Sequence, residues 1–440
     1  EDAMKYIAAV APEAMLLPVG GAGSAVHWAV LQGTEELTRM IIELVPREAH
    51  EVFDANGQAP AHLAAARGNV AALRLLFAAA PSAAAAASRD GKVIAHYGAQ
   101  QEHVVDYLAS VLMQADFCVQ DTRGRTPLHV AARGEFAAPV AKLLSLLPPE
   151  QYVVEERATG ATALHWAAEH GCLQSLKALL TKLSPEQAGA CDSSGATALH
   201  YAVRSVGQRR DKLAVLLAHL PGAAIGLCDS TGSNALHSFA RRTCGTQTCV
   251  VEAELLLFAA PGLLHDRDND GQTALHSSAA AGHVDLLQLL ARKAPPEILV
   301  SLDSHGRTFL HYAVLVLNDM ELLRGLVAAM PVEGLAAQDV SGSTCLHLAC
   351  TTGRFAVVDL ICGALPDSSL GVANMHGQTA LHVAAVHCTA PTVRSMLNRL
   401  AAIGWDLQDA HGRTARDVAA GRGRRDIAQL MNMPPKSAVA

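Results

Sequence analysis

The sequence predicts an all-α solenoid in which short helix pairs, joined by hairpin-like loops, stack one on another. Three observations support this fold class. The six residues GATALH occur twice, at 160–165 and at 195–200. The looser pattern Gly-x-Thr-x-Leu-His then returns along the chain at intervals of 33 to 39 residues. Aromatic residues make up only 4% of the chain, so its core must be built from Leu, Val and Ala.

A column of eleven histidines defines the repeat. Close matches to the pattern end at His129, His165, His200, His276, His311, His347 and His382, and looser ones end at His27, His62, His96 and His237. A last copy, GRTARD, has Asp417 in the histidine position. Self-similarity at a period near 35 residues is typical of a repeat array. Each repeat in such an array packs only on its neighbours, so the array can be longer than a domain with a single core.

Each repeat is predicted to contain a turn and two helices. Asp192-Ser193-Ser194-Gly195 is a turn signal, because Gly tolerates positive φ, and Thr197 is placed to cap the first helix. The second helix carries an apolar stripe, which in one repeat consists of Leu173, Leu176, Leu179 and Leu180. Helices of about ten residues are marginal in water, so each pair must bury its stripe against its neighbours.

A proline recurs where the second helix should stop, as in LPPEQ (147–151) and LSPEQ (183–187). Ser or Pro, then Pro, then Glu suits the cap and first two positions of a helix. The sequence therefore predicts an extra helical turn between consecutive repeats.

The full pattern, D-x-x-G-x-T-A/P-L-H-x-A-A-x-x-G followed by a Leu-rich helix, resembles the ankyrin repeat over residues 1–432. The resemblance implies a curved ankyrin-repeat solenoid. We divide the chain into an incomplete leading repeat at 1–22, an array of about twelve repeats at 23–432, and a tail at 433–440. Residues 4–13 align with the second helix at 177–186, so we expect the chain to be a segment of a longer protein with another repeat upstream.

Composition narrows the cellular setting. A net charge of −7 is mild and does not favour a chain that coats nucleic acid or an acidic membrane. There is no apolar run of 18 residues, and the ten cysteines form no Cys-x-x-Cys pair. These features predict reduced thiols and a cytoplasmic or other reducing intracellular compartment. Cys244 and Cys249 share one predicted loop, and whether they pair stays open.

No catalytic motif, cofactor site or metal site is predicted. Asp266-x-Asp268-x-Asp270-Gly271 resembles the start of a calcium loop, but position twelve is Ser277 rather than a bidentate Glu, which favours an ordinary hairpin. The resemblance implies that the repeat histidines bond the backbone of the adjoining loop rather than a metal. Aromatic residues that directly follow a repeat histidine are expected to be core, as at Trp28, Trp166, Tyr201 and Tyr312.

The resemblance also implies that residues four and five after each histidine are exposed in a concave groove. This column is largely basic in the centre of the chain and mostly apolar afterwards. The predicted partner-binding residues are Arg133, Glu169, His170, Arg204, Arg241, Arg242, Leu315, Val316, Thr351 and Val386. A solvated face is the alternative interpretation of the arginines.

The resulting hypothesis is a non-catalytic protein–protein interaction scaffold or adaptor, a subunit of a larger assembly that binds a partner segment along its groove. Two alternatives differ in class. The chain is the ankyrin arm of a larger membrane channel or enzyme whose working domain lies outside it, or it binds nucleic acid through its central arginines. Nucleic acid is disfavoured because those arginines lack interleaved exposed aromatics and lie in an acidic chain.

Overall fold

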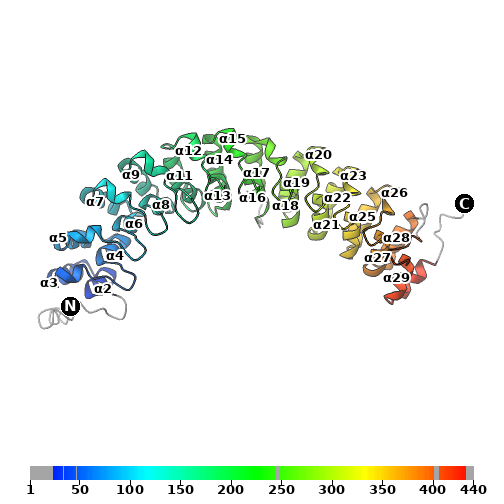
Figure 1. Ribbon diagram of the computed structural model, residues 1–440, viewed down its shortest axis with the longest axis horizontal. Coiled ribbons are helices and arrows are strands. Elements are labelled where there is room, and N and C mark those ends of the chain that lie inside the picture. The colour runs from blue at the N-terminus through cyan, green and yellow to red at the C-terminus, as the bar shows by residue number, and fades with distance from the viewer. Residues whose placement is uncertain (1–22, 33, 46, 243–247, 401–405, 433–440) are drawn as a thin grey trace. The chain divides into compact units, whose positions relative to one another are not determined.

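The computed structural model describes residues 23–32, 34–45, 47–242, 248–400 and 406–432. The predicted leading repeat at 1–22, the tail at 433–440, and the pairing of Cys244 with Cys249 lie outside this description. The chain divides into two compact units, Glu1–Asp229 and Ser230–Ala440. Each unit is an all-α solenoid of stacked helix pairs, as the sequence predicts (Figure 1). The described residues contain no multi-residue strand, only isolated bridges.

In Glu1–Asp229 the helices form two rows (Figure 1). The first helix of each repeat gives one row: α2 (Ala25–Gln32), α4 (Pro60–Arg67), α6 (Ile94–Gly98), α8 (Pro127–Ala132), α10 (Ala163–Glu169) and α13 (Ala198–Arg204). The second helices give the other: α3 (Glu35–Leu44), α5 (Val70–Ala79), α7 (Glu102–Val111), α9 (Ala138–Leu146), α11 (Leu173–Leu180) and α14 (Arg209–His219). Each helix packs on its own partner and on its equivalents in adjacent repeats, as α10 does on α8, α11 and α13.

Ser230–Ala440 is built in the same way. Its first helices are α16 (Ala235–Ala240), α18 (Ala274–Ala281), α21 (Phe309–Val316), α24 (Cys345–Thr351), α27 (Ala380–His387) and α29 (Ala415–Gly421). Its second helices are α17 (Thr248–Ala259), α19 (Val284–Lys293), α22 (Met320–Ala329), α25 (Phe355–Ala364), α28 (Ala390–Leu400) and α30 (Arg425–Leu430).

The predicted extra turn after the second helix is confirmed. After α11, the Ser184 hydroxyl accepts from the Gln187 amide at 3.2 Å and caps α12 (Pro185–Ala188), with Pro185 as the first helical residue. The equivalent turns are η2 (Arg47–His50), η3 (Pro81–Ala85), η4 (Gln114–Phe117), η5 (Pro149–Val153), α15 (Gly222–Ile225), η6 (Pro261–Leu264), α20 (Pro296–Leu299), α23 (Val332–Leu335) and α26 (Asp367–Leu370).

The core follows the apolar stripes. Leu164, Leu176 and Leu179 are almost fully buried, and Ala167 and Ala168 of α10 allow neighbouring first helices to approach closely. A fully buried Leu side chain contributes about 1.5–3 kcal/mol relative to an exposed one. Because every repeat uses its neighbours for this burial, the stability of the array comes from the interfaces between repeats.

Hairpin loops connect the repeats on one edge. In the loop before α13, the Asp192 amide donates to the Ala196 carbonyl at 2.9 Å and the Gly195 amide donates to the Asp192 carbonyl at 3.0 Å. The Ser193 amide donates to the Thr159 carbonyl of the previous loop at 2.8 Å. Gly160 of that loop has a φ of 68°, and a Cβ there would lie 2.7 Å from the Ser193 nitrogen. Glycine is therefore required both for its conformation and for the close stacking of hairpins.

Candidate partner-binding site

The repeat histidines hold each first helix to the next hairpin. In the repeat of α10, the Thr162 amide donates to His165 Nδ1 at 3.1 Å, so the proton of the neutral ring lies on Nε2, which donates to the Ala196 carbonyl at 3.2 Å. His129 bonds the Ala161 carbonyl in the same way. Burial lowers the pKa of His129 and His165 to about 4. These rings are neutral structural links, as the resemblance implies.

The hairpin aspartate uses its two oxygens differently. Asp192 Oδ1 accepts from the Ser194 and Ala196 amides at 2.8 and 2.9 Å, which fixes the turn. Its Oδ2 accepts from the Tyr201 hydroxyl at 2.8 Å. These hydrogen bonds lower the pKa of Asp192 against the opposing effect of burial. Tyr312 and Asp303 form the same pair at 2.6 Å.

The predicted groove residues of Glu1–Asp229 carry charges at the surface. Arg133 and Arg204 are exposed, Glu169 is half-buried and His170 is exposed. The Arg133 guanidinium lies 5.4 Å from the centre of the Trp166 ring, and the Arg204 guanidinium lies 5.4 Å from the centre of the Tyr201 ring. Neither arginine has a carboxylate partner among the described residues. Both therefore present a charge that an aromatic ring orients and no acidic side chain neutralises.

The expectation that the aromatic residues after the histidine are core is not met. Trp28 is 43% exposed, and Trp166, Tyr201 and Tyr312 are only half-buried. This position lies beside the hairpin, where a tyrosine hydroxyl reaches the aspartate and the ring face is left for a cation.

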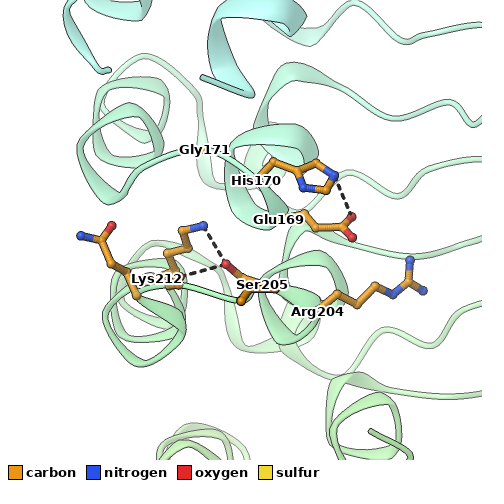
Figure 2. Close-up of a pocket in the computed structure, with 9 residues that line it drawn as sticks. Glu169, His170, Gly171, Arg204, Ser205 and Lys212 are labelled. Carbon is orange, nitrogen blue, oxygen red and sulfur yellow. Dashed lines mark hydrogen bonds and ion pairs between the residues drawn. The ribbon is translucent and has the colours of Figure 1, made fainter. Parts of the chain in front are cut away.

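A pocket of about 310 Å³ opens between the repeats of α10 and α13 (Figure 2). It brings together three predicted residues, Glu169, His170 and Arg204. Six further lining residues are not among the predicted site residues: Gly171, Ser205, Val206, Gly207, Gln208 and Lys212. The loop from Ser205 to Gln208 forms one wall. Gln208 has a φ of 52°, and among the described residues it is the one non-glycine residue in the left-handed region. Its Oε1 accepts from the Leu173 amide at 3.0 Å.

Lys212 lies at the bottom of this pocket, on α14. Its side chain is almost fully buried, at a position that is apolar or small in most other repeats. Its ammonium donates to the Ala168 carbonyl at 3.1 Å and to Ser205 Oγ at 2.9 Å. These bonds use two of the three protons that an ammonium can donate. Burial lowers its pKa to about 8. Nothing in the sequence predicts this burial except the place of the lysine, one position before the apolar stripe.

The pairing of Ser205 with Lys212 is structural. A serine nucleophile would give its proton to the lysine, but the Ser205 hydroxyl donates instead to the Gly207 carbonyl at 2.9 Å, and Ser205 is 1% exposed. The pair joins α14 to the end of α13.

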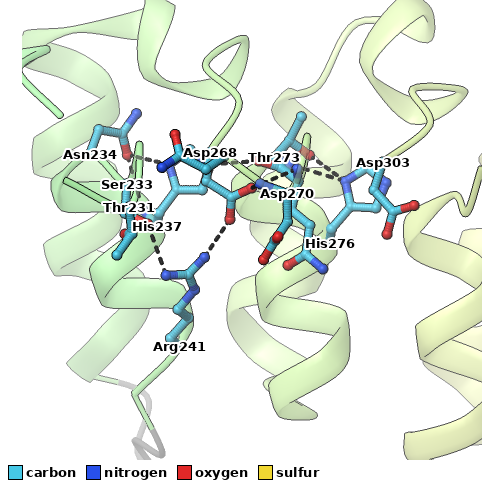
Figure 3. Close-up of polar contacts among 12 residues, drawn as sticks. Thr231, Ser233, Asn234, His237, Arg241, Asp268, Asp270, Thr273, His276 and Asp303 are labelled. Atoms are coloured by element: carbon cyan, nitrogen blue, oxygen red, sulfur yellow. Dashed lines mark hydrogen bonds and ion pairs between the residues drawn. The ribbon is translucent and has the colours of Figure 1, made fainter. Parts of the chain in front are cut away.

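Figure 3 shows the contacts of Arg241, in Ser230–Ala440, which differ from the ring contact of Arg204. Its guanidinium forms an ion pair with Asp268 Oδ2 and donates to Ser233 Oγ at 2.8 Å. The Asp268 side chain is 1% exposed, while Asp268 Oδ1 accepts from the Asp270 and Gln272 amides at 2.9 and 2.8 Å. Asp268, from the motif that resembles a calcium loop, is thus part of a hairpin. The described residues contain no group of three side chains placed to hold a metal ion.

The remaining predicted residues differ in their exposure to solvent. Leu315 and Val316, at the end of α21, are 40% and 44% exposed. Thr351 is exposed, whereas Arg242 and Val386 are half-buried. Val316 packs over Gly282 of the previous repeat, where a Cβ would lie 3.0 Å from Cγ1 of Val316.

Sequence comparisons agree with this architecture. A profile described as "Ankyrin repeats (3 copies)" matches residues 136–225, 208–299 and 246–334, and one described as "Ankyrin repeat" matches residues 341–369. Together the matches cover more than half of the chain, so the protein belongs to the ankyrin-repeat family, whose repeats are non-enzymatic protein-interaction modules.

Among named proteins, the chain is similar to inversin. Human inversin is 36% identical over 112 residues, which are 25% of this chain and 10% of inversin, and dog inversin matches to the same extent. The match thus spans about a tenth of the length of these relatives. Among the described residues, no helix has the length and apolar character needed to cross a membrane.

Proposed function

We propose that this chain is a non-catalytic interaction scaffold, a subunit of a larger assembly, and that its first-helix face binds a protein segment. Ankyrin repeats supply the general role of protein–protein interaction. The observation that carries the specific proposal is that Arg133 and Arg204 are each held on an aromatic ring without an acidic partner among the described residues. The segment that meets Glu1–Asp229 is therefore acidic at these two points.

In Ser230–Ala440 the contact is apolar. Leu315 and Val316 are exposed on α21, and an apolar surface of this kind favours association with a partner over contact with water. Arg241 contributes less to recognition, because a partner carboxylate would have to displace Asp268. Arg242, Thr351 and Val386 extend the proposed contact surface.

We infer a reducing compartment for the protein. Cys345, Cys350, Cys362 and Cys388 are reduced thiols buried in the core of Ser230–Ala440. In an oxidising compartment, such thiols would be exposed to unproductive pairing during folding.

A tagged chain, recovered from cell extract with its partners and quantified by mass spectrometry, tests the proposal. Two double variants, Arg133→Glu with Arg204→Glu and Leu315→Glu with Val316→Glu, should each lower partner recovery several-fold. Matched controls are Arg292→Glu and Val332→Glu, which are exposed on other helices. Unchanged recovery in both double variants contradicts the proposed surface.

A second candidate is the binding arm of a larger protein that works as a channel or an enzyme. The region of human inversin that is similar to this chain is 10% of that protein, so similar repeats occur within a longer chain. The sequence that flanks residues 1 and 440 in the transcript tests it, because long apolar segments or a catalytic motif there would favour the arm.

A further inference from the structure

Three consecutive repeats of Glu1–Asp229 place charges in alternating order at the fourth position after the histidine. The residues are Arg133 after His129, Glu169 after His165 and Arg204 after His200. The preceding repeat has the uncharged Gln100 in this position. The order along the stack is therefore positive, negative, positive.

The three charges do not neutralise one another. Arg133 lies over Trp166 and Arg204 over Tyr201, at 5.4 Å in each case. The ion-pair contact of Glu169 is with His170, at 4.0 Å, which is the limit of such a contact. Figure 2 shows the Glu169 carboxylate turned to His170 and the Arg204 guanidinium directed away from Lys212. The aromatic rings hold the arginines in place, so a ligand would meet three separate charges that need little rearrangement.

The spacing of the repeats sets the spacing of the complementary charges. Packed helices lie about 8–10 Å apart, and an extended chain in the polyproline II conformation advances about 3.1 Å per residue and brings every third side chain to the same face. One repeat therefore corresponds to about three residues of an extended ligand. A helical ligand, at about 1.5 Å per residue, would need about six or seven.

The pocket between Glu169 and Arg204 distinguishes the two ends of this charge pattern, because it is lined by Arg204 and not by Arg133. Its rim carries Val206, which is 94% exposed, and it lies on one side of Glu169 only. An apolar side chain between the basic residue of the ligand and one of its two acidic residues fits here. The charge order acidic-basic-acidic is the same in both chain directions, so such a side chain would fix the direction in which the ligand binds.

From this arrangement we infer that Glu1–Asp229 recognises an extended segment of a protein partner with the charge order acidic, basic, acidic at intervals of about three residues. The acidic residues pair with Arg133 and Arg204, and the basic residue pairs with Glu169. The inference rests on the proposed interaction function and specifies the chemistry of the partner.

Three peptides in a Gly/Ser background test the charge order with the whole chain: Glu-x-x-Lys-x-x-Glu, the permutation Glu-x-x-Glu-x-x-Lys with the same composition and net charge, and the inverse Lys-x-x-Glu-x-x-Lys. Fluorescence anisotropy at low salt measures each affinity. The alternating acidic peptide should bind roughly tenfold more tightly than its permutation, because two of its three favourable ion pairs become repulsive in the permutation.

A charge-reversed protein provides the decisive arm. In the triple variant Arg133→Glu, Glu169→Arg and Arg204→Glu, the preference should change to Lys-x-x-Glu-x-x-Lys. The control exchanges two exposed charges elsewhere in the unit, Lys182→Glu with Glu186→Lys, and should leave the preference unchanged. Circular dichroism melts establish that both variants fold.

Equal binding of the permuted peptides, or no binding of any, overturns the inferred charge order. Tighter binding of a peptide with seven-residue intervals overturns the extended conformation. Both results leave the proposed interaction function standing if partner recovery still depends on Arg133 and Arg204. Loss of that dependence would instead contradict the proposed function itself.

Discussion

Arg204 and Arg241 occupy the same position in two repeats, four residues after the histidine, yet their surroundings differ. Arg204 lies on the Tyr201 ring and lines a pocket. Arg241 is bound to the buried carboxylate of Asp268 and to Ser233. Position in the repeat therefore predicts where an arginine lies but not whether it is available to a partner.

Hairpin aspartates differ in the group that donates to their Oδ2. In the repeat of Arg204, Tyr201 supplies this donor to Asp192. In the repeat of α18 the corresponding residue is Ser277, which is too short to reach, and Arg241 from the previous repeat donates to Asp268 instead. The hairpin of α8 uses a third solution, in which Arg125 donates to Asp121 at 2.9 Å. Buried carboxylate oxygens need hydrogen-bond donors, and an arginine that serves as this donor is less available to a protein partner.

The largest predicted effect is the loss of stability at acidic pH, to which the buried histidine of each repeat contributes. Burial lowers the pKa of His129, His165 and His311 to about 4 and lowers that of His237. Between pH 6.5 and 4 the unfolded chain therefore binds more protons, so stability is complete above about pH 6.5 and falls as the pH drops through this window. Melting temperatures from pH 8 to 4 should show this decline. An unchanged melting temperature from pH 7 to 5 would contradict it.

Replacing the hairpin aspartate should have the next largest effect. Asp268→Ala removes the acceptor for two backbone amides and leaves the pairing site of Arg241 empty. We expect the free energy of unfolding to fall by about 2–4 kcal/mol, measured by urea unfolding at pH 7.5. Asp268→Asn is the matched control, because its amide oxygen still accepts from the turn, and it should cost about half as much. Equal costs for the two variants would show that the retained acceptor oxygen contributes nothing and that the charge of Asp268 carries the whole effect.

The two arginines themselves should differ in the same assay. Arg241→Ala leaves the buried Asp268 carboxylate without its charged donor and should cost about 1–2 kcal/mol. Arg204→Ala removes only a contact with an exposed ring face and should stay within about 0.5 kcal/mol of the wild type. In the partner-recovery assay the order should reverse, since Arg204 is the available charge. Similar stability losses for both variants would remove the distinction.

The smallest predicted loss of stability concerns the tyrosine hydroxyl that donates to the hairpin aspartate. Tyr201→Phe removes the hydroxyl that donates to Asp192 Oδ2 and should cost about 0.5–1.5 kcal/mol. Tyr312→Phe, which breaks the equivalent bond to Asp303, should cost a similar amount. Urea unfolding at pH 7.5 measures both losses. An unchanged free energy of unfolding in Tyr201→Phe would contradict a contribution from this hydrogen bond.

Much of the fold could be predicted from the sequence because the repeat acts through short-range chemistry. Thr162 and His165 are three residues apart and make the contacts expected at a helix start, and the prolines after the second helix begin the extra turns as predicted. The helix pairs and their order follow from these local signals together with the Leu stripes.

The candidate site was less predictable, because its properties depend on contacts between repeats. The pair of Arg241 and Asp268 joins residues 27 positions apart, and nothing local distinguishes Arg241 from Arg204. The burial of Lys212 depends on the Ala168 carbonyl, 44 positions away. One signal was available in the sequence: Tyr201 and Tyr312 each follow a hairpin aspartate by nine residues, a spacing that marks the tyrosine as its donor.

The histidine links give each unit a polarity along the chain. His129 and His165 each donate forward, to a carbonyl of the following repeat, and His382 does the same to the Arg413 carbonyl. Removing a following repeat strands a buried ring N–H, which is costly, whereas removing a preceding repeat frees a carbonyl that water can reach. Shortening a unit from its C-terminal side should therefore be more damaging than shortening it equally from its N-terminal side. The same chemistry gives the stack a sense of direction that its near-identical helix pairs do not reveal.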